Sequence, residues 1–114
     1  MIDWLSLEKE QQLDEIVQLS HDIHIDAVAI FKHSTRCSIS SMAKNRLERS
    51  WNPNNKNIPV YYLDLISFRQ LSNDIANRFN LIHESPQLLL IQKGELMAHA
   101  SHSAISAAIL EELI

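Results

Sequence analysis

The apolar residues of this chain recur with two different periods, and each period predicts a type of secondary structure. Three stretches with apolar residues at helical spacing predict amphipathic helices: 7–20, 38–50 and 68–79. Three short apolar runs, rich in β-branched residues, predict buried strands: 26–31, 58–65 and 87–92. A Lys-Gly pair then predicts a tight turn into the alternating stretch 95–100, which has the pattern of a hairpin partner. Ser6 and Ser67 are the expected caps of the first and third helices.

The C-terminal stretch predicts a further helix that begins at Ser101 or Ser103. Its apolar residues are Ile105, Ile109, Leu110 and Leu113. Strands joined through a helix are expected to be parallel with a right-handed crossover, whereas the last two strands form an antiparallel hairpin. We therefore predict an α/β fold with thioredoxin topology. It is one domain over residues 1–114, with a four-stranded mixed sheet flanked by helices on both faces and an N-terminal helix.

The composition narrows the class of protein. The chain has 114 residues, of which 46% are hydrophobic, and its formal net charge of -4 argues against a general nucleic-acid binder. A single cysteine cannot form an internal disulfide, which fits a reducing compartment. The first residues lack the pattern of a signal peptide, and no apolar run approaches the roughly 20 residues needed to span a bilayer. We expect a cytoplasmic protein that does not associate with membranes.

The single cysteine, Cys37, follows four polar residues and is expected to open the second helix. The first turn of a helix presents unpaired N–H groups and a partial positive charge, which stabilise a thiolate over a thiol. Arg36 and Lys32 add positive charge nearby, and His33 adds more when protonated. This position predicts a nucleophile for thiol–disulfide exchange. The alternative is that Cys37 is a small buried residue of the core.

Ser40 lies three residues after Cys37, where a dithiol protein would carry its second sulfur. We expect its hydroxyl to face Cys37 across one helical turn and to donate a hydrogen bond to the thiolate. The alternative is a first-turn serine that satisfies local backbone groups. Because oxygen cannot resolve a disulfide, a second molecule must release any adduct on Cys37.

The segment "HESPQ", 83–87, lies between the third helix and the third predicted strand. In the thioredoxin topology a proline at this place is cis and its loop faces the active sulfur, so we predict a cis bond before Pro86. The alternative is a trans proline that opens an edge strand. With a cis bond, Ser85 would offer its backbone N–H and C=O to the backbone of a bound thiol or peptide.

Four strings, in this order and spacing, carry a resemblance to a known family: "FKHSTRCSIS", "YYLDLI", "HESPQLLLI" and "KGELMAHASHSAIS". They resemble the YtxJ family of bacillithiol-system proteins, the monothiol bacilliredoxins of the thioredoxin-like superfamily. The resemblance implies a cytoplasmic oxidoreductase that removes bacillithiol, a cysteinyl-glucosamine-malate thiol, from mixed disulfides with client proteins. No bound cofactor is needed, because bacillithiol is a co-substrate.

Carried to this chain, the resemblance makes Cys37 the nucleophile and Pro86 the cis-proline, and it places Ser40 where a resolving cysteine would stand. The malate carboxylates are expected to contact Arg36 or Lys32. Family members often have a proline directly after the cysteine, where this chain has serine. That difference bears on the redox potential.

Metal binding is one competing interpretation. Two His-x-x-His pairs could join Cys37 around zinc: His21 with His24, and His99 with His102. Monothiol glutaredoxins bridge an iron–sulfur cluster with a Gly-Phe pair after the cysteine, but Ser38 and Ile39 stand there in this chain.

A third interpretation is a non-catalytic binding module that uses the Pro86 loop and the face around Trp51, with Cys37 as a redox sensor.

Overall fold

Five strands form one mixed sheet in the computed structural model, which describes residues 2–52 and 56–112, apart from the side chains of 111 and 112. The strand order is β1-β3-β2-β4-β5. The strands are β1 (Trp4–Ser6), β2 (Val28–His33), β3 (Val60–Asp64), β4 (Gln87–Gln92) and β5 (Glu95–Ser101). The helices are α1 (Gln11–Ser20), α2 (Ser38–Ser50) and α3 (Arg69–Arg78), followed by two 3-10 segments, η1 (His102–Ala104) and η2 (Ala107–Glu112).

The strand pairing follows the prediction in part. β2 and β3 are joined through α2 and are parallel, as expected. β4 follows α3 but runs antiparallel to β2, and therefore opposite to β3, so the expected parallel direction is wrong for this strand. β4 and β5 form an antiparallel hairpin. Its turn residues Lys93 and Gly94 both have positive φ angles, 52° and 78°, which glycine adopts without steric cost.

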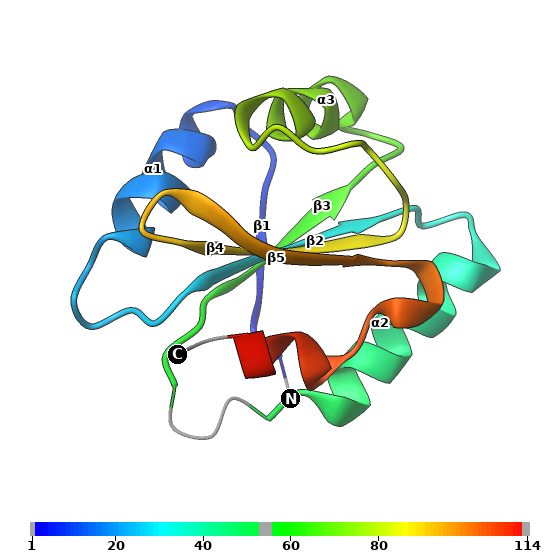
Figure 1. The fold of residues 1–114 in the computed structure, drawn as a ribbon. Helices are drawn as coiled ribbons and strands as arrows, with labels where there is room; N and C mark the ends of the chain where they lie inside the picture. Colours follow the sequence, from blue (N-terminus) through cyan, green and yellow to red (C-terminus); the bar gives the residue numbers. More distant parts are fainter. Residues whose placement is uncertain (1, 53–55, 113–114) are drawn as a thin grey trace.

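The sheet has a separate hydrophobic cluster on each face. α1 and α3 cover one face, and α2 and the 3-10 segments cover the other (Figure 1). Successive side chains of a strand point to opposite faces. Ile30 of β2 therefore belongs to the cluster under α1 and α3, and Phe31 belongs to the cluster under α2. The central strands are therefore buried on both faces, as their continuous apolar sequences predict.

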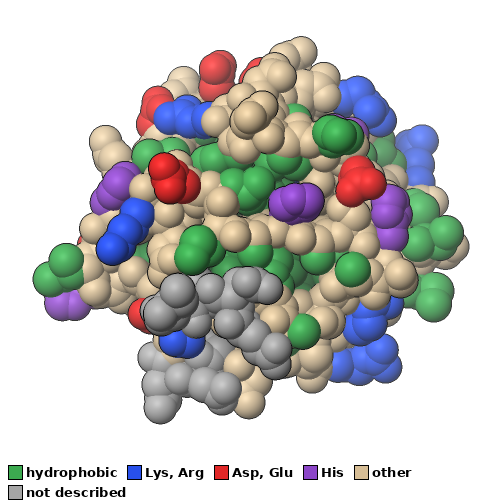
Figure 2. Space-filling view, viewed as in Figure 1, with side chains coloured by type: hydrophobic (Ala, Val, Ile, Leu, Met, Phe, Trp, Pro, Cys, Tyr) green, Lys and Arg blue, Asp and Glu red, His purple; other side chains and the backbone are tan. Residues whose placement is uncertain are grey.

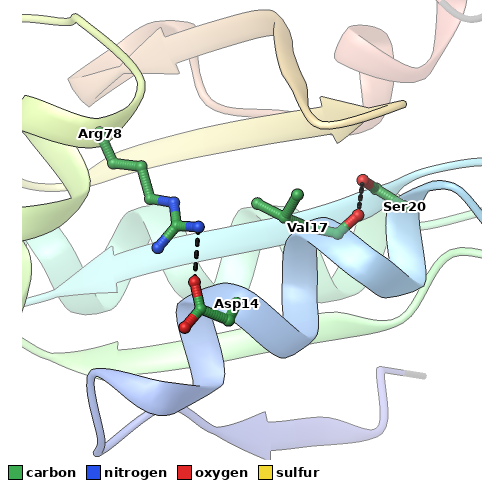
Figure 3. Close-up of polar contacts among 4 residues, drawn as sticks. All are labelled: Asp14, Val17, Ser20 and Arg78. Atoms are coloured by element: carbon green, nitrogen blue, oxygen red, sulfur yellow. Dashed lines mark hydrogen bonds and ion pairs between the residues drawn. The ribbon is translucent and has the colours of Figure 1, made fainter.

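Polar contacts hold α1 near both of its ends; Figure 3 shows the ion pair with Arg78 of α3 and the hydrogen bond within α1 from Ser20 to Val17. Near its start, Asp14 Oδ1 lies 2.6 Å from Arg78 Nη2 of α3. At its end, the hydroxyl of Ser20 donates to the Val17 carbonyl at 2.6 Å and accepts from the Gly94 N–H at 2.8 Å. The second contact connects α1 to the turn of the β4–β5 hairpin.

The N-terminal segment differs from the prediction. The sheet has five strands instead of four, because residues 4–6 pair with β3 as a parallel edge strand. Leu7, assigned to the helix from its spacing, continues this pairing through its N–H to the Tyr62 carbonyl and is fully buried. α1 begins only at Gln11, and Ser6 does not cap it: the Ser6 carbonyl accepts from the Gln12 side chain.

Three other boundaries also differ. β2 continues through Lys32 and His33, where the sequence pattern predicted a break. Ser67 does not cap α3, since its hydroxyl donates to Asp64 Oδ2 at 3.1 Å and the helix begins at Arg69. The C-terminal helix is two 3-10 segments. Leu113, which the sequence pattern places in that helix, lies outside the described residues.

No helix in the described ranges has the length and apolar character to cross a membrane.

Candidate functional site

Cys37 occupies the N-cap position of α2, as the sequence predicts. Its backbone is extended, with φ −105° and ψ 120°, and the helix begins at the next residue. Its N–H donates to the Ser34 carbonyl at 3.1 Å, and its carbonyl accepts from the Ser41 N–H at 3.0 Å. The side chain is half-buried and the thiol is free. A half-buried cysteine thus lies at the position where the first N–H groups of a 13-residue helix have no intrahelical partner.

The Ser85–Pro86 peptide bond is cis, which is the geometry predicted from the topology. Lys32 of β2 pairs with Gln87 of β4, so the two residues before Gln87 lie beside the end of β2. The loop to Cys37 leaves from that same end. Pro86 is buried, and its carbonyl accepts from the His102 N–H at 3.1 Å. Among the described residues, the buried Ser85 hydroxyl has no hydrogen-bond partner.

Ser40 is oriented differently from the prediction. Its side chain is fully buried, and its Oγ lies 2.6 Å from His33 Nδ1. The same oxygen accepts from the Ser34 N–H at 3.1 Å. Within the described part of the chain, no hydrogen bond joins Ser40 to the Cys37 sulfur. The hydroxyl therefore orders the loop behind the cysteine, which is the local backbone role that the sequence analysis kept as its alternative.

His33 is the residue whose role at the site the sequence analysis missed. It ends β2 on the same face as Phe31, and its ring lies 5.7 Å from the Phe31 ring and 5.5 Å from the Tyr62 ring, between ring centroids. Burial lowers the pKa of His33, and the positive charge of Lys44 lowers it further, against smaller raising effects from Asp64 and Ser40. The ring is therefore neutral near pH 7 and does not supply the positive charge expected of it. The neutral ring shares a hydrogen bond with the Ser40 hydroxyl through Nδ1.

The structure does not bring Lys32 to the cysteine. The side chain of Lys32 is fully buried on the face covered by α1 and α3, opposite α2. Its Nζ donates to the Ser72 carbonyl at 3.1 Å and lies 3.3 Å from His83 Nδ1. Burial lowers the pKa of Lys32 to about 8. The expected contact between Lys32 and a small thiol is therefore wrong, because the alternation of the strand turns this side chain inward.

Arg36, by contrast, is exposed directly before the cysteine. Two large apolar side chains of α2 are also exposed: Ile39 at 62% and Met42 at 63%. Figure 2 shows hydrophobic side chains at the right of the molecule, where α2 begins, with basic side chains below them. The surface beside Cys37 is thus apolar and basic.

The histidine pairs considered for zinc lie outside α2 and form no metal site with Cys37 among the described residues. His21 and His24 follow α1, and His99 and His102 lie on β5 and at the start of η1; all four are exposed. Among the described side chains, those of residues 2–52 and 56–110, no three His, Cys, Asp or Glu groups come together as a metal site. Trp51, considered as part of a binding face, is half-buried at the end of α2 and contacts the cluster on that face.

The sheet order, the flanking helices and a half-exposed cysteine at the first turn of α2 define a thioredoxin-like protein. A solved structure described as having a thioredoxin fold and as a candidate oxidoreductase is similar, with 27% identity and a TM-score of 0.78. That match covers 96% of this chain and 91% of the other. The thioredoxin of Trypanosoma brucei brucei has 10% identity and a TM-score of 0.72, over 96% and 87% of the two chains. The thioredoxin of Malassezia sympodialis has 14% identity and a TM-score of 0.68, over 97% and 87%.

The family is narrower than the fold. The family model described as "Monothiol bacilliredoxin BrxC" matches residues 5–110, which is nearly the whole chain. The chain belongs to this monothiol bacilliredoxin family. The resemblance that the four sequence strings indicated is confirmed at this level, and the chain is a redox thiol protein.

Proposed function

We propose that this protein removes bacillithiol from mixed disulfides with client proteins, using Cys37 as its single nucleophile. The observation that carries the proposal is the position of Cys37: the residue is half-buried at the N-cap of α2, in a chain of the monothiol bacilliredoxin family. The first backbone N–H groups of the helix have no intrahelical partner at this position. We propose a cytoplasmic location and no bound cofactor, and we expect neither nucleic acid nor membrane as a partner.

In the first step, the Cys37 thiolate attacks the bacillithiol-side sulfur of the client disulfide. The S–S bond of the client breaks while a new S–S bond forms between Cys37 and bacillithiol. The client sulfur leaves as a thiolate and takes a proton from solvent. The client is now reduced, and the protein carries the small thiol as a mixed disulfide.

In the second step, another thiolate must attack this adduct, because the chain has no second cysteine. A second bacillithiol releases the Cys37 thiolate and leaves as a bacillithiol disulfide, which a separate disulfide reductase returns to the thiol. Arg36 is exposed beside the cysteine and is the proposed contact for the malate carboxylates. The backbone N–H and C=O of Ser85, before the cis Pro86, are proposed to bind the backbone of the thiol or the client.

The test uses a bacillithiolated peptide whose release is followed by mass spectrometry. Wild-type protein is expected to free the peptide and to gain one bacillithiol on Cys37, and added bacillithiol should then clear that adduct. Cys37→Ala should release nothing. Full turnover by the alanine variant would contradict the proposal. A parallel reaction with a glutathionylated peptide measures the preference for bacillithiol as the ratio of the two release rates. Arg36→Gln should lower this ratio.

A further inference from the structure

The charges of this acidic protein are unevenly distributed along the chain. Residues 36–50, the loop residue Arg36 and α2, contain four basic residues and one acidic residue. The rest of the chain contains six basic and thirteen acidic residues. The acidic residue of α2, Glu48, is already bound: it accepts from Trp4 Nε1 at 2.9 Å and lies 3.5 Å from Lys44 Nζ. The surface of α2 is therefore basic on a protein that is negative as a whole.

The same helix has apolar side chains that the fold leaves exposed. Ile39 and Met42 come one turn apart, and farther along the helix a surface hollow of about 440 Å³ is lined by Met42, Asn45, Arg46, Glu48 and Arg49. Arg46 is held in place, because its guanidinium donates to the carbonyls of Ile105 and His102 at 2.8 and 2.9 Å. Arg49 is exposed, and no described carboxylate forms an ion pair with it. The exposed surface of α2 is thus apolar near Cys37 and positively charged near the C-terminal end of the helix.

We propose that this α2 surface binds an acidic segment of the client polypeptide in an extended conformation. The inference rests on the proposed function, because the client must present its mixed disulfide to Cys37 while its neighbouring residues lie along the helix. The positive surface and the exposed apolar pair select a partner of opposite charge with an apolar residue close to its cysteine.

The geometry specifies the spacing in the client. Helical rise of about 1.5 Å per residue places Met42 about 8 Å and Arg49 about 18 Å along the axis from Cys37. An extended peptide advances about 3.3 Å per residue. The preferred client therefore has an apolar residue about two positions from its modified cysteine and an acidic residue about five or six positions from it.

The first experiment compares bacillithiolated peptides that differ only at the fifth and sixth positions on each side of the cysteine, with glutamate in one set and lysine in the other. Wild-type protein is expected to release a glutamate peptide about two- to fivefold faster at low salt, the range for one exposed ion pair. Arg49→Glu should reverse the preference. The matched control is Lys9→Glu, an equal charge change on an exposed loop residue before α1, and it should leave the preference unchanged. Equal rates for the two peptides with wild-type protein would overturn the inference.

A second readout separates docking from chemistry. Fluorescence anisotropy of the same peptides with serine in place of cysteine measures binding without exchange, and Arg49→Glu and Met42→Ser should both weaken binding of the glutamate peptide. If exchange fails entirely while this preference holds, the proposed function is wrong and the docking surface stands. If Met42→Ser instead changes the oligomeric mass in sedimentation and leaves peptide binding unchanged, the surface binds a second copy of this chain and the inference is wrong.

Discussion

The Ser40 hydroxyl stabilises the loop that leads to Cys37. It bonds the His33 ring and accepts the Ser34 N–H inside a fully buried environment. Ser40→Ala leaves both groups without this partner, so the free energy of unfolding should fall by about 1–3 kcal/mol. Urea denaturation measures the change. Ser41→Ala, at the half-buried next position, is the control and should stay within about 0.5 kcal/mol. An unchanged midpoint for Ser40→Ala would show that the hydroxyl contributes nothing.

Lys32 is a buried amine without a carboxylate beside it among its described partners. Its pKa is lowered to about 8 in the folded protein from 10.5, so between these pH values the unfolded chain binds more protons. Stability contributed by this group therefore rises with pH across that window and is lowest below it.

Lys32→Met removes the charge at similar volume. The Ser72 carbonyl keeps its place in the α3 hydrogen-bond ladder, and His83 Nδ1 keeps the Ser72 hydroxyl at 3.1 Å. The variant should be more stable than wild type at pH 7, and the difference should shrink as the pH rises from 8 to 10.5. Urea unfolding at several pH values measures this, with the exposed Lys9→Met as control. A difference that grows with pH would contradict it.

The positions of two residues of the candidate site were predictable from the sequence. Cys37 opens a helix after a polar break, and Pro86 precedes a buried strand, so their placement follows from local patterns. Lys32 and His33 were not predictable in the same way. Polar residues at the end of an apolar run predict a loop. The hydrogen-bond partner of buried Lys32 lies 40 residues away in the sequence, and that of buried His33 lies seven residues away.

At the scale of elements, long amphipathic segments were predictable and short ones were not. The patterns of α2, α3 and β4 extend over two or more turns or a whole buried strand, so their types were predicted correctly. The three residues of β1 gain their conformation from pairing with β3, which no local period reveals. The apolar spacing of the C-terminal stretch fits a helix, yet the stretch forms two 3-10 segments. Arg46 of α2 donates to the carbonyls of His102 and Ile105, in and directly after the first of them.

This attachment gives an element-scale prediction. The two donors of the Arg46 guanidinium reach two carbonyls at once, a geometry that lysine cannot reproduce. Arg46→Lys keeps the charge but should loosen the segment, so the amides of Ile105 and Ile109 should exchange with deuterium faster. Arg49→Lys, one turn farther on, is the control. Unchanged exchange at both amides in Arg46→Lys would assign the stability of the segment to its apolar contacts alone.

At the scale of the whole molecule, the two hydrophobic clusters share the same strands. Ile30 and Phe31 are neighbours in β2 and belong to opposite clusters. If the strand unfolds, both clusters therefore lose contacts at the same time. We therefore expect the described part of the chain to unfold as one cooperative unit. A change in one cluster should be detected by a probe in the other.

Ile75→Val tests this coupling. It removes a methyl group from the cluster under α1 and α3 and should cost about 0.5–1.5 kcal/mol. Trp4 and Trp51 contact the opposite cluster, so their fluorescence reports on the far face of the sheet. The denaturation midpoints from fluorescence and from far-UV circular dichroism should fall by the same amount. Ile23→Val, at a position that is 92% exposed, should move neither. If the dichroism midpoint falls while the fluorescence midpoint stays, the two faces unfold separately.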